Sequence, residues 1–470
     1  MKTDAKISRK EGMKTCILNI AFQKSEAMLY YRESISRETG TWRDILRCGK
    51  LRPRCPSRRA SLFGKPRRLF MLHEEGGFPM MRIGQFCETY PPSVDGVGRV
   101  MEAYCQTLDE MGHQSVYIAP KNPAYTSETP TYELLLYPGI SIPGQAYRLG
   151  IPRLSRRFRR SAEAMHFDVI HAHSPFVSGL EARRVAKKIG APVVATFHSK
   201  YYDDFYEATR SKLLAKLGIS IALRFYRSCD EVWTVNEKTA EVLRGYGYKG
   251  EIITMLNGTN PLSVTDAERT DALSRFPLRP SVPTLIFAGQ MDYKKNVDSI
   301  LRACALLSQK GVDFQLIMAG SGSNESSIRA LAKGLGLAKQ TIFTGFLPER
   351  HVLLSLMERA DLLVFPSVYD NAPMVVREAA AMGTPALLVE NSCAAEGIAH
   401  QDNGFLCPNT PESIAECIEE ALPLCTQVGE RARATIPVPW EEIMAKAVAR
   451  YERLIEKKRS AKEQGVCHEN

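Results

Sequence analysis

Short apolar runs alternate with helical patterns along most of this chain, and the alternation limits the folds that the sequence can adopt. Each run is apolar on both faces and rich in Val, Ile and Leu, as parallel strands are when helices cover both sides of their sheet. The alternation therefore predicts an α/β protein built on parallel sheets. The runs span residues 81–86, 116–119, 169–170, 192–197, 232–235, 284–288, 314–319, 362–365 and 385–389.

A polar segment that contains two prolines divides these runs into two groups. Two α/β domains are therefore expected. After the second group the sequence passes two more prolines and enters an amphipathic pattern that predicts one final helix. The predicted parts are an N-terminal domain at 81–262, a linker at 263–282, a C-terminal domain at 283–435, a closing helix at 436–459 and a tail at 460–470.

The formal net charge of +10 comes from one end of the chain. Residues 1–80 hold 18 basic and 8 acidic side chains, whereas the rest of the chain holds 44 of each sign. A basic balance indicates nucleic acid or an anionic surface as partner, but here it applies to the first 80 residues alone. We expect no nucleic-acid partner for the neutral body.

Residues 1–80 have three interpretations: a basic arm that binds phosphate groups, a disordered tail, or a translated leader that is not native. Glu74 to Gly77 require purine-rich codons, and Met80 and Met81 follow after two residues. This is the layout of a bacterial ribosome-binding site before a start codon. We therefore expect a non-native or disordered basic leader.

The 12 cysteines form no Cys-x-x-Cys pair and no Cys/His cluster with zinc spacing. They are typical of reduced thiols in a cytoplasmic protein, and no metal site is expected. The longest apolar runs have the length of strands, so no membrane-spanning helix is expected either.

Small or polar residues follow nearly every predicted strand. Ligands of open parallel sheets bind outside the carboxyl ends of the strands, so these groups should converge from both domains on one cleft. They are His171 to Ser174, His198-Ser199, Asn236, Gly289-Gln290, Gly320 to Gly322 and Pro366-Ser367.

Two glycine-containing loops precede predicted helices. Gly320 and Gly322 follow a strand and open a helix, where free backbone N–H groups and the helix dipole bind phosphate. Gly96 lies in the first loop of the N-terminal domain, before a helix that begins near Arg99. Facing each other, the two loops would hold a diphosphate; a plain tight turn is the alternative for each.

Three charged residues lie near the predicted cleft. Lys295 follows a strand closely enough to meet the diphosphate, although a solvated loop lysine is the alternative. Asp370 lies in a loop, and Glu378 lies inside the Ala-rich helix after it. A buried carboxylate needs a partner, which would be a neighbouring arginine or a pair of ribose hydroxyls.

His198 ends a buried strand, where it could bind a sugar hydroxyl or a phosphate; a locally satisfied structural histidine is the alternative. His171 and His173 are two residues apart at the preceding strand end. We expect them to point to opposite faces and to be poor joint metal ligands.

Taken together, the motifs resemble those of the retaining glycosyltransferases of family 4, which have the GT-B architecture of two Rossmann-like domains facing a cleft, with a C-terminal helix returning to the first domain. The resemblance covers residues 81–458. Its most specific pieces are Tyr90 to Gly96, Thr196 to His198, Asn257 to Thr259, Gly289 to Asn296, Gly320 to Gly322, Thr344 to Phe346, and Pro366 to Ala379.

The resemblance implies roles for individual residues. Glu378 matches the acid that holds the nucleotide ribose, and Asp370 matches the acid beside the donor sugar. Lys295 matches the lysine that neutralises the donor diphosphate, and His198 matches a histidine beside the transferred sugar. The other donor-side positions are Gly96, Gln290, Gly320, Gly322 and Phe346.

Three positions depart from the family pattern. Asp370 stands where Glu is usual, and Gln290 stands where an arginine is expected near the diphosphate. Ala372 and Pro373 replace a usual Phe-Gly, and proline has no N–H to offer a sugar hydroxyl.

The resemblance implies metal-independent, retaining transfer of a hexose, glucose from UDP-glucose, to an acceptor hydroxyl, with the nucleotide sugar as co-substrate and no other cofactor. The sequence from Asp370 to Glu396 most resembles diacylglycerol glucosyltransferases, which points to a membrane lipid as acceptor. A polysaccharide glycosyltransferase and a catalytically weak binding subunit are the alternatives. An NAD-dependent dehydrogenase would need a complete G-x-G-x-x-G with a following acid, which neither glycine loop supplies.

A lipid acceptor would call for a membrane-facing patch on the N-terminal domain. A basic segment before the predicted strand at 169–170 alternates with Ile151, Leu154 and Phe158 at helical spacing. The pattern predicts a basic amphipathic helix with peripheral contact to the inner face of the cell membrane, or else an ordinary surface helix. The arginines concerned are Arg153, Arg156, Arg157 and Arg160.

Overall fold

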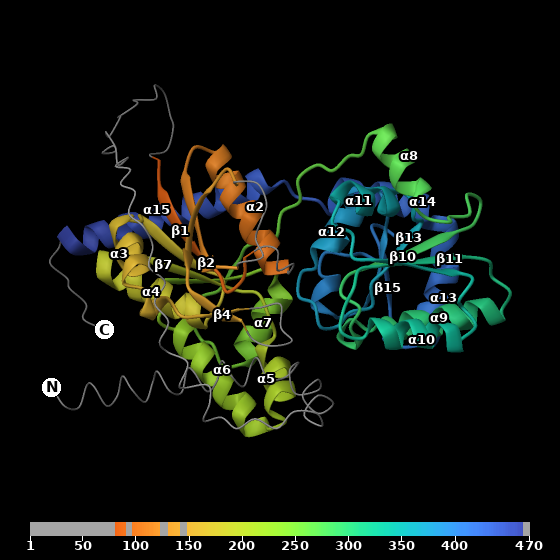
Figure 1. The fold of residues 1–470 in the computed structure, drawn as a ribbon, viewed down its shortest axis with the longest axis horizontal. Coiled ribbons are helices and arrows are strands. Elements are labelled where there is room, and N and C mark those ends of the chain that lie inside the picture. The colour runs from red at the N-terminus through yellow and green to blue at the C-terminus, as the bar shows by residue number, and fades with distance from the viewer. Residues whose placement is uncertain (1–79, 91–95, 123–129, 142–147, 464–470) are drawn as a thin grey trace, which may run out of the picture.

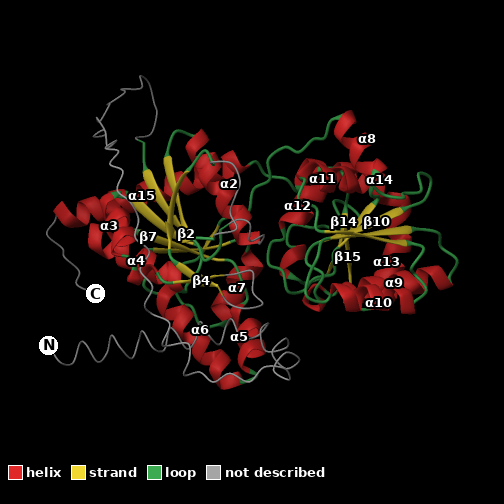
Figure 2. Cartoon of the chain, viewed as in Figure 1, coloured by secondary structure: helices red, strands yellow, loops and turns green. Residues whose placement is uncertain are grey.

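The computed structural model describes residues 80–90, 96–122, 130–141 and 148–463 (Figure 1). The leader expected at 1–80 lies outside the described residues except for Met80, as does the end of the tail beyond residue 463. The described chain forms two α/β halves, and Figure 2 shows each sheet between layers of helices.

The N-terminal half is built on a seven-stranded parallel sheet of order β3-β2-β1-β6-β7-β8-β9. Its strands are β1 (Arg82–Phe86), β2 (Gln114–Pro120), β3 (Glu133–Tyr137), β6 (Val169–Ala172), β7 (Val193–Phe197), β8 (Glu231–Thr234) and β9 (Ile253–Thr254). A small antiparallel ribbon of β4 (Gly139–Ser141) and β5 (Arg148–Gly150) lies beside it. The helices are α2 (Gly96–Glu110), η1 (Pro152–Leu154), α3 (Arg156–Ala164), α4 (Val177–Ile189), α5 (Tyr201–Thr209), α6 (Lys212–Tyr226) and α7 (Glu237–Gly245).

The C-terminal half is built on a six-stranded parallel sheet of order β12-β11-β10-β13-β14-β15. Its strands are β10 (Thr284–Ala288), β11 (Gln315–Ala319), β12 (Thr341–Gly345), β13 (Leu362–Val364), β14 (Ala386–Val389) and β15 (Phe405–Cys407). Its helices are α8 (Asp266–Ser274), η2 (Tyr293–Lys295), α9 (Val297–Gln309), α10 (Glu325–Gly334), α11 (Arg350–Arg359), α12 (Met374–Ala381), η3 (Cys393–Ala395), α13 (Pro411–Ala421), η4 (Leu422–Leu424) and α14 (Cys425–Thr435).

Strand order reverses once in each sheet. In the N-terminal sheet the chain leaves β1 to build outward through β2 and β3, then returns to the other side of β1 as β6. In the C-terminal sheet β13 returns to the other side of β10 in the same way. The loops after these strands therefore diverge and leave a crevice at the carboxyl edge, which is where open α/β sheets bind ligands. The two parallel sheets confirm the predicted α/β fold class.

The segment expected as a linker, 263–282, contains helix α8. A capping box between Thr265 and Glu268 begins this helix, and Ala272 is fully buried in the core of the C-terminal half. Arg269 pairs with Glu358 of α11 at 2.6 Å. Helix α8 therefore packs as part of the C-terminal half.

The last helix, α15 (Trp440–Glu463), returns to the N-terminal half, as expected of the closing helix. Its apolar face packs on α2 and on the inner strands of the first sheet. Tyr451 stacks on Trp233 of β8 at 5.4 Å between ring centroids, and its hydroxyl bonds His171 Nδ1 at 2.7 Å. Trp233 and His171 are both fully buried, so these contacts anchor the last helix in the core of the N-terminal half.

We predict that Tyr451→Phe lowers the free energy of unfolding by about 1–3 kcal/mol, because it leaves a buried ring nitrogen of His171 without its partner. The urea midpoint measures the change. Tyr206→Phe is the control, since Tyr206 is 38% exposed and its loss should cost less than about 0.5 kcal/mol. Equal midpoints for Tyr451→Phe and the unmodified protein would show that the hydroxyl contact contributes nothing.

Candidate active site

The loop after β10 meets the loop after β13 in an ion pair. Lys295 Nζ lies 2.5 Å from Asp370 Oδ1, and Ser367 donates its hydroxyl to the other carboxylate oxygen at 2.6 Å. The ring of Tyr369 lies 5.2 Å from Lys295 Nζ, within the range of a cation–π contact. The two charged residues predicted from the sequence thus lie together at the reversal point of the C-terminal sheet.

Gly320 and Gly322 allow the loop after β11 to approach the loop after β10. A Cβ at Gly320 would lie 2.0 Å from the Gly289 carbonyl oxygen, and one at Gly322 would lie 2.6 Å from that of Met291. Gly320 also has a φ of +127°, which L side chains rarely adopt. Both glycines are therefore required by backbone packing, which keeps the tight-turn interpretation open beside phosphate binding.

The loop after β13 is hydrogen-bonded to the N-terminal half. Asn236 Nδ2, at the start of α7, donates to the carbonyl oxygens of Asn371 and Cys393, both at 2.9 Å. Asn371 Nδ2 donates in turn to the His198 carbonyl oxygen at 2.6 Å. Lys200 Nζ donates to the Val368 carbonyl oxygen at 2.9 Å. These bonds fix the Asp370 loop against the end of β7.

Helix α5 contacts both loops of the C-terminal half, the one after β13 through Tyr369 and the one after β10 through Lys294. Tyr369 donates its hydroxyl to Asp204 Oδ1 at 2.7 Å, and Lys294 Nζ lies 2.6 Å from Glu207 and 3.6 Å from Asp204. Burial raises the pKa of Asp204, which the bond from Tyr369 partly offsets. Burial opposes the charge of Lys294, but the bond to Glu207 together with the negative charges of Asp204, Glu207 and Asp292 outweighs it and raises the pKa of Lys294.

Glu396 caps a helix of the opposite half. Its two carboxylate oxygens accept the backbone N–H groups of Glu237 and Lys238, at 2.8 and 2.6 Å, at the first turn of α7. A carboxylate is stabilised at the positive end of a helix dipole, so this contact helps to hold the two halves together.

Glu378 is buried and paired with two arginines. Arg350 of α11 lies 3.0 Å from its Oε1, and Arg99 of α2 lies 3.9 Å from the same oxygen. The neighbouring Arg377 bonds the Ile436 carbonyl oxygen instead. The carboxylate thus has the arginine partner that its burial requires, and one of the two arginines comes from the N-terminal half.

Three histidines form a stack that ends at the cleft. The rings of His171 and His173 lie 4.1 Å apart, and those of His173 and His198 lie 5.3 Å apart. His173 Nδ1 lies 3.0 Å from His198 Nε2, and its Nε2 lies 2.9 Å from the Gln85 side-chain oxygen. Burial lowers the pKa of all three, that of His198 to about 4, so the stack is neutral at pH 7.

The expectation that His171 and His173 point to opposite faces is wrong. Residues two apart along a strand lie on the same face, and the stacked rings follow that rule. Each ring has its own protein partners, Tyr451 and Thr196 for His171, and Gln85 and His198 for His173.

The remaining predicted donor-side residues lie at loop or helix ends. Gly96 begins α2, and a Cβ added to it would meet no atom within 4 Å. The residues just before it lie outside the described chain. Gln290 is exposed after β10, and Phe346 is half exposed after β12. Pro373 is the N-cap of α12, where its missing N–H costs the helix nothing.

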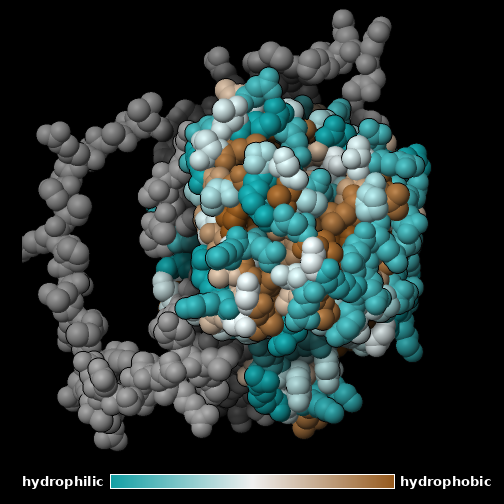
Figure 3. Space-filling view, turned by 90° about the vertical axis from the view of Figure 1, so that its right-hand side faces the viewer, coloured by the Kyte–Doolittle hydropathy of each residue, from teal (hydrophilic) through white to brown (hydrophobic). Residues whose placement is uncertain are grey.

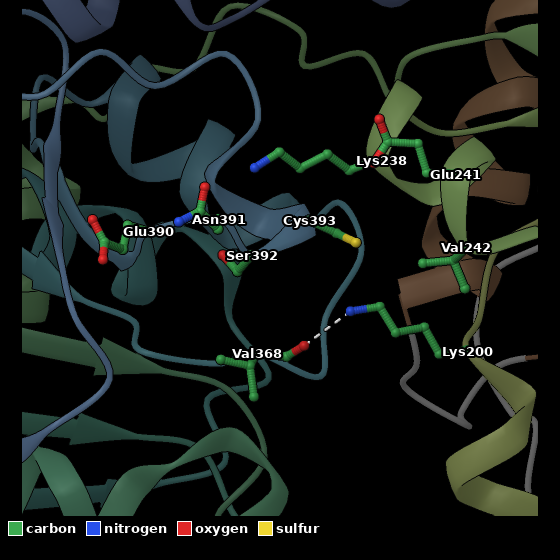
Figure 4. Close-up of a pocket in the computed structure, with 9 residues that line it drawn as sticks. All are labelled: Lys200, Lys238, Glu241, Val242, Val368, Glu390, Asn391, Ser392 and Cys393. Carbon is green, nitrogen blue, oxygen red and sulfur yellow. Dashed lines mark hydrogen bonds between the residues drawn. The ribbon is translucent and has the colours of Figure 1, made fainter. Parts of the chain in front are cut away.

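An open pocket of about 670 Å³ lies between the two halves, on the side of α7 (Figure 4). Its charged side chains come mainly from the N-terminal half, and its polar loop residues come from the C-terminal half. No sequence motif predicted this pocket. It is lined by Lys200, Lys238, Glu241, Val242, Val368, Glu390, Asn391, Ser392 and Cys393.

Among the residues that the structure describes, no three His, Cys, Asp or Glu side chains gather as a metal site would require. In the same part of the chain, no helix combines the length and the apolar character needed to cross a bilayer.

The predicted basic helix at 153–160 is η1 followed by α3. Four of its arginines, Arg153, Arg156, Arg157 and Arg160, are exposed. Phe158, however, is buried and packs edge-on against Tyr137 at 5.1 Å. The apolar face of α3 therefore belongs to the core, whereas Leu154, the last residue of η1, is 78% exposed.

Several residues that shape the cleft were not predicted. Asn371, Tyr369, Glu396, Arg350 and Arg99 act through contacts between distant segments, which no local pattern reveals. Asn371 is also buried with its side-chain oxygen unpartnered among the described residues, which makes it a candidate acceptor for a ligand hydroxyl.

Two family models match the chain, one on each half. The model described as "Glycosyltransferase Family 4" matches residues 94–261, and that described as "Glycosyl transferases group 1" matches residues 269–435.

Similar proteins agree with these matches. An alpha-monoglucosyldiacylglycerol synthase of Streptococcus pneumoniae is 24% identical over 321 residues, which is 65% of this chain and 70% of that protein. The solved sucrose-phosphate synthase of Thermosynechococcus elongatus superposes with a TM-score of 0.66 at 18% identity, over 80% of this chain and all of that one. Anabaena Alr3699/HepE, solved in complex with UDP and glucose, gives 0.64 at 14% identity, over 78% and 99%. The structural likeness establishes the GT-B fold.

We predict that Glu396→Ala speeds amide exchange at the start of α7 by about tenfold, since a charge-assisted pair of hydrogen bonds to a helix end is lost. Hydrogen–deuterium exchange of the peptide containing Glu237 and Lys238 measures it. Glu390→Ala, a glutamate of the same region that lines the pocket, is the control. Unchanged exchange in Glu396→Ala would mean that the two halves are not held together by this cap.

Proposed function

Because this chain belongs to the glycosyltransferases, with a family 4 N-terminal domain and a group 1 C-terminal domain, we propose that it transfers glucose from UDP-glucose to an acceptor hydroxyl with retention of anomeric configuration. The observation that carries the proposal is the pair of Lys295 and Asp370 at the reversal point of the C-terminal sheet, held against the end of β7 where His198 lies. A cation, a carboxylate and a neutral imidazole then face one donor sugar.

Lys295 stabilises the departing diphosphate. Its ammonium group is paired with Asp370, and a diphosphate that arrives there competes for the same cation. Charge that develops on the leaving group is stabilised by a preorganised cation at the site, so binding strengthens toward the transition state. Lys295 and nearby helix N-termini supply positive charge to the leaving group, and we propose that the reaction needs no metal.

Glu378 accepts the ribose hydroxyls. Both arginine contacts are closest to Oε1, so Oε2 is the oxygen better placed to accept a hydrogen bond from the nucleotide. The two arginines compensate the burial of this carboxylate, and its remaining oxygen can accept hydrogen bonds.

His198 binds a sugar hydroxyl rather than a phosphate. A pKa of about 4 keeps its ring neutral, and a neutral ring offers no charge to an anion. Its Nε2 is engaged with His173, which leaves Nδ1 for the sugar. The buried side-chain oxygen of Asn371 accepts a second hydroxyl.

The acceptor proton passes to an oxygen of the leaving phosphate on the same face of the sugar. No separate general base is then needed, and retention follows because acceptor and leaving group share one face. The contacts of the Asp370 loop with β7 and α5 exclude water, which would otherwise hydrolyse the donor.

For the acceptor we propose a diacylglycerol-type membrane lipid. The name of the Streptococcus pneumoniae relative supports this choice, and so does the sequence of the segment from Asp370 to Glu396, which resembles that of diacylglycerol glucosyltransferases. The exposed arginines of η1 and α3 fit electrostatic contact with an anionic inner membrane face. Transfer to a cell-surface polysaccharide is the alternative acceptor chemistry.

A catalytically weak binding subunit is the second candidate, favoured by Gln290 and Pro373, which remove a cation and an N–H donor from the donor site. It differs from the first in one measurable respect: it would bind the nucleotide sugar without turnover.

We predict that Lys295→Ala and Glu378→Ala each lower transfer from UDP-glucose to diacylglycerol in mixed micelles by at least about 100-fold, the loss expected when a group that stabilises transition-state charge or fixes the donor is removed. Formation of the glycolipid product is measured by chromatography, and the coupling constant of its anomeric proton shows whether the configuration is retained. Lys333→Ala, an exposed lysine of α10, is the matched control and should transfer normally.

Transfer that continues unchanged in both variants would overturn these residue roles. UDP-glucose binding without any transfer by the unmodified protein would favour the binding-subunit candidate. A β-linked product would contradict retention.

A further inference from the structure

The hairpin of α5 and α6 presents an apolar tip to solvent. It extends from the lower edge of the N-terminal half in Figure 1, and in Figure 3 a small apolar area lies at the very bottom of the molecule, below mostly hydrophilic and pale atoms. Leu213 is 77% exposed, Leu217 is 50% and Leu214 is 47%. We call these three leucines, with Tyr206 of α5, the α6 tip.

The α6 tip is not an incompletely packed core. On the opposite side of α6, Ala215, Gly218 and Ile219 are buried, and a Cβ at Gly218 would lie 2.6 Å from the ring of Phe205 in α5. The helix is thus seated on α5 as closely as its backbone allows. Single exposed leucines are ordinary, but three within five residues form a patch of the kind that marks a contact surface.

The charge on α6 beside the three leucines has one sign, whereas Asp203 and Glu207 flank Tyr206 on α5. From Ala208 to Cys229 the chain holds five basic residues and no acidic one. Lys212 and Lys216 lie one helical turn apart beside the leucines, and all five basic side chains are exposed. The five are Arg210, Lys212, Lys216, Arg224 and Arg227.

A basic rim around projecting leucines fits an anionic bilayer better than a protein groove. Leucines on a convex tip can enter the acyl boundary of a bilayer while lysines and arginines meet the phosphate headgroups. The η1–α3 surface offers the arginines but a single exposed leucine, Leu154, because the apolar face of α3 packs in the core through Phe158. The α6 tip has both components exposed.

The α6 tip is also connected to the cleft. Helix α5 runs from the tip to the cleft, where Asp204 and Glu207 contact Tyr369 and Lys294 of the C-terminal half. A bilayer that holds the tip therefore lies on the side of the molecule where α5 borders the cleft.

We propose that the α6 tip docks on an anionic lipid bilayer, with Leu213, Leu214 and Leu217 inserted among the headgroups and the neighbouring lysines at the phosphates. The inference goes beyond the proposed transfer reaction, because it requires a lipid surface and does not depend on the acceptor being a lipid.

The test is flotation of the full chain with vesicles of phosphatidylglycerol and phosphatidylcholine, compared with vesicles of phosphatidylcholine alone. The unmodified protein should float with the anionic vesicles and should lose this binding as salt rises. The triple variant Leu213→Ser, Leu214→Ser, Leu217→Ser should bind at least about tenfold more weakly, since burying one leucine is worth at least that factor in partitioning. Its melting temperature should not fall, because the three side chains are exposed.

Two further variants make the test specific. The double variant Lys212→Glu, Lys216→Glu should weaken binding to anionic vesicles and flatten its salt dependence. Leu154→Ser, an exposed leucine among the α3 arginines, is the matched control and should float as the unmodified protein does. Donor binding, measured without vesicles, should be the same in all variants.

The proposal is overturned if the unmodified protein does not float at low salt, or if the triple variant floats equally well. It is also overturned if Leu154→Ser abolishes flotation, which would place the contact at α3. An oligomer that the triple substitution dissociates, with flotation unchanged, would identify the tip as an interface between copies of the chain. Failure of transfer with flotation intact would count against the proposed function and leave this inference standing.

Discussion

The ion pair of Lys295 and Asp370 organises the cleft. A partly buried ammonium group needs a carboxylate until an anionic ligand replaces it, and the two strands that flank the reversal point of the C-terminal sheet supply one residue each. The loop that carries Asp370 is also the loop that Asn236, Lys200 and Asp204 hold from the N-terminal half. The cation is therefore fixed in position relative to His198, and the two halves meet around it.

The sequence predicted the parts of the fold that follow from burial. Strands covered on both faces read as continuous apolar runs, and all nine predicted runs coincide with strands. The strands missed in the two sheets were β3, β9, β12 and β15, which lie at or next to the sheet edges and are half-buried, very short or both. An edge strand has a neighbouring strand on one side only and is less fully buried, so its amino-acid composition differs little from that of a loop.

The candidate site was predictable as far as local motifs define it. Lys295 and Asp370 were placed at one cleft because both follow strands, and the reversal of strand order then brings them into contact. The partners of Glu378 could not be predicted, because Arg99 and Arg350 reach it from distant helices. The amphipathic pattern of α3 was ambiguous in the same way: periodicity reveals an apolar face, but only the tertiary structure tells whether that face packs in the core or meets solvent. Phe158 packs in the core, whereas the leucines of α6 meet solvent.

A crystal structure with a non-hydrolysable analogue of UDP-glucose tests the central claim most directly. We predict a diphosphate oxygen within hydrogen-bond distance of Lys295 Nζ, in place of the Asp370 contact, with the ribose hydroxyls at Glu378 and the hexose beside His198. A nucleotide seated instead in the pocket of Lys200 and Lys238, with the pair of Lys295 and Asp370 intact, would contradict it.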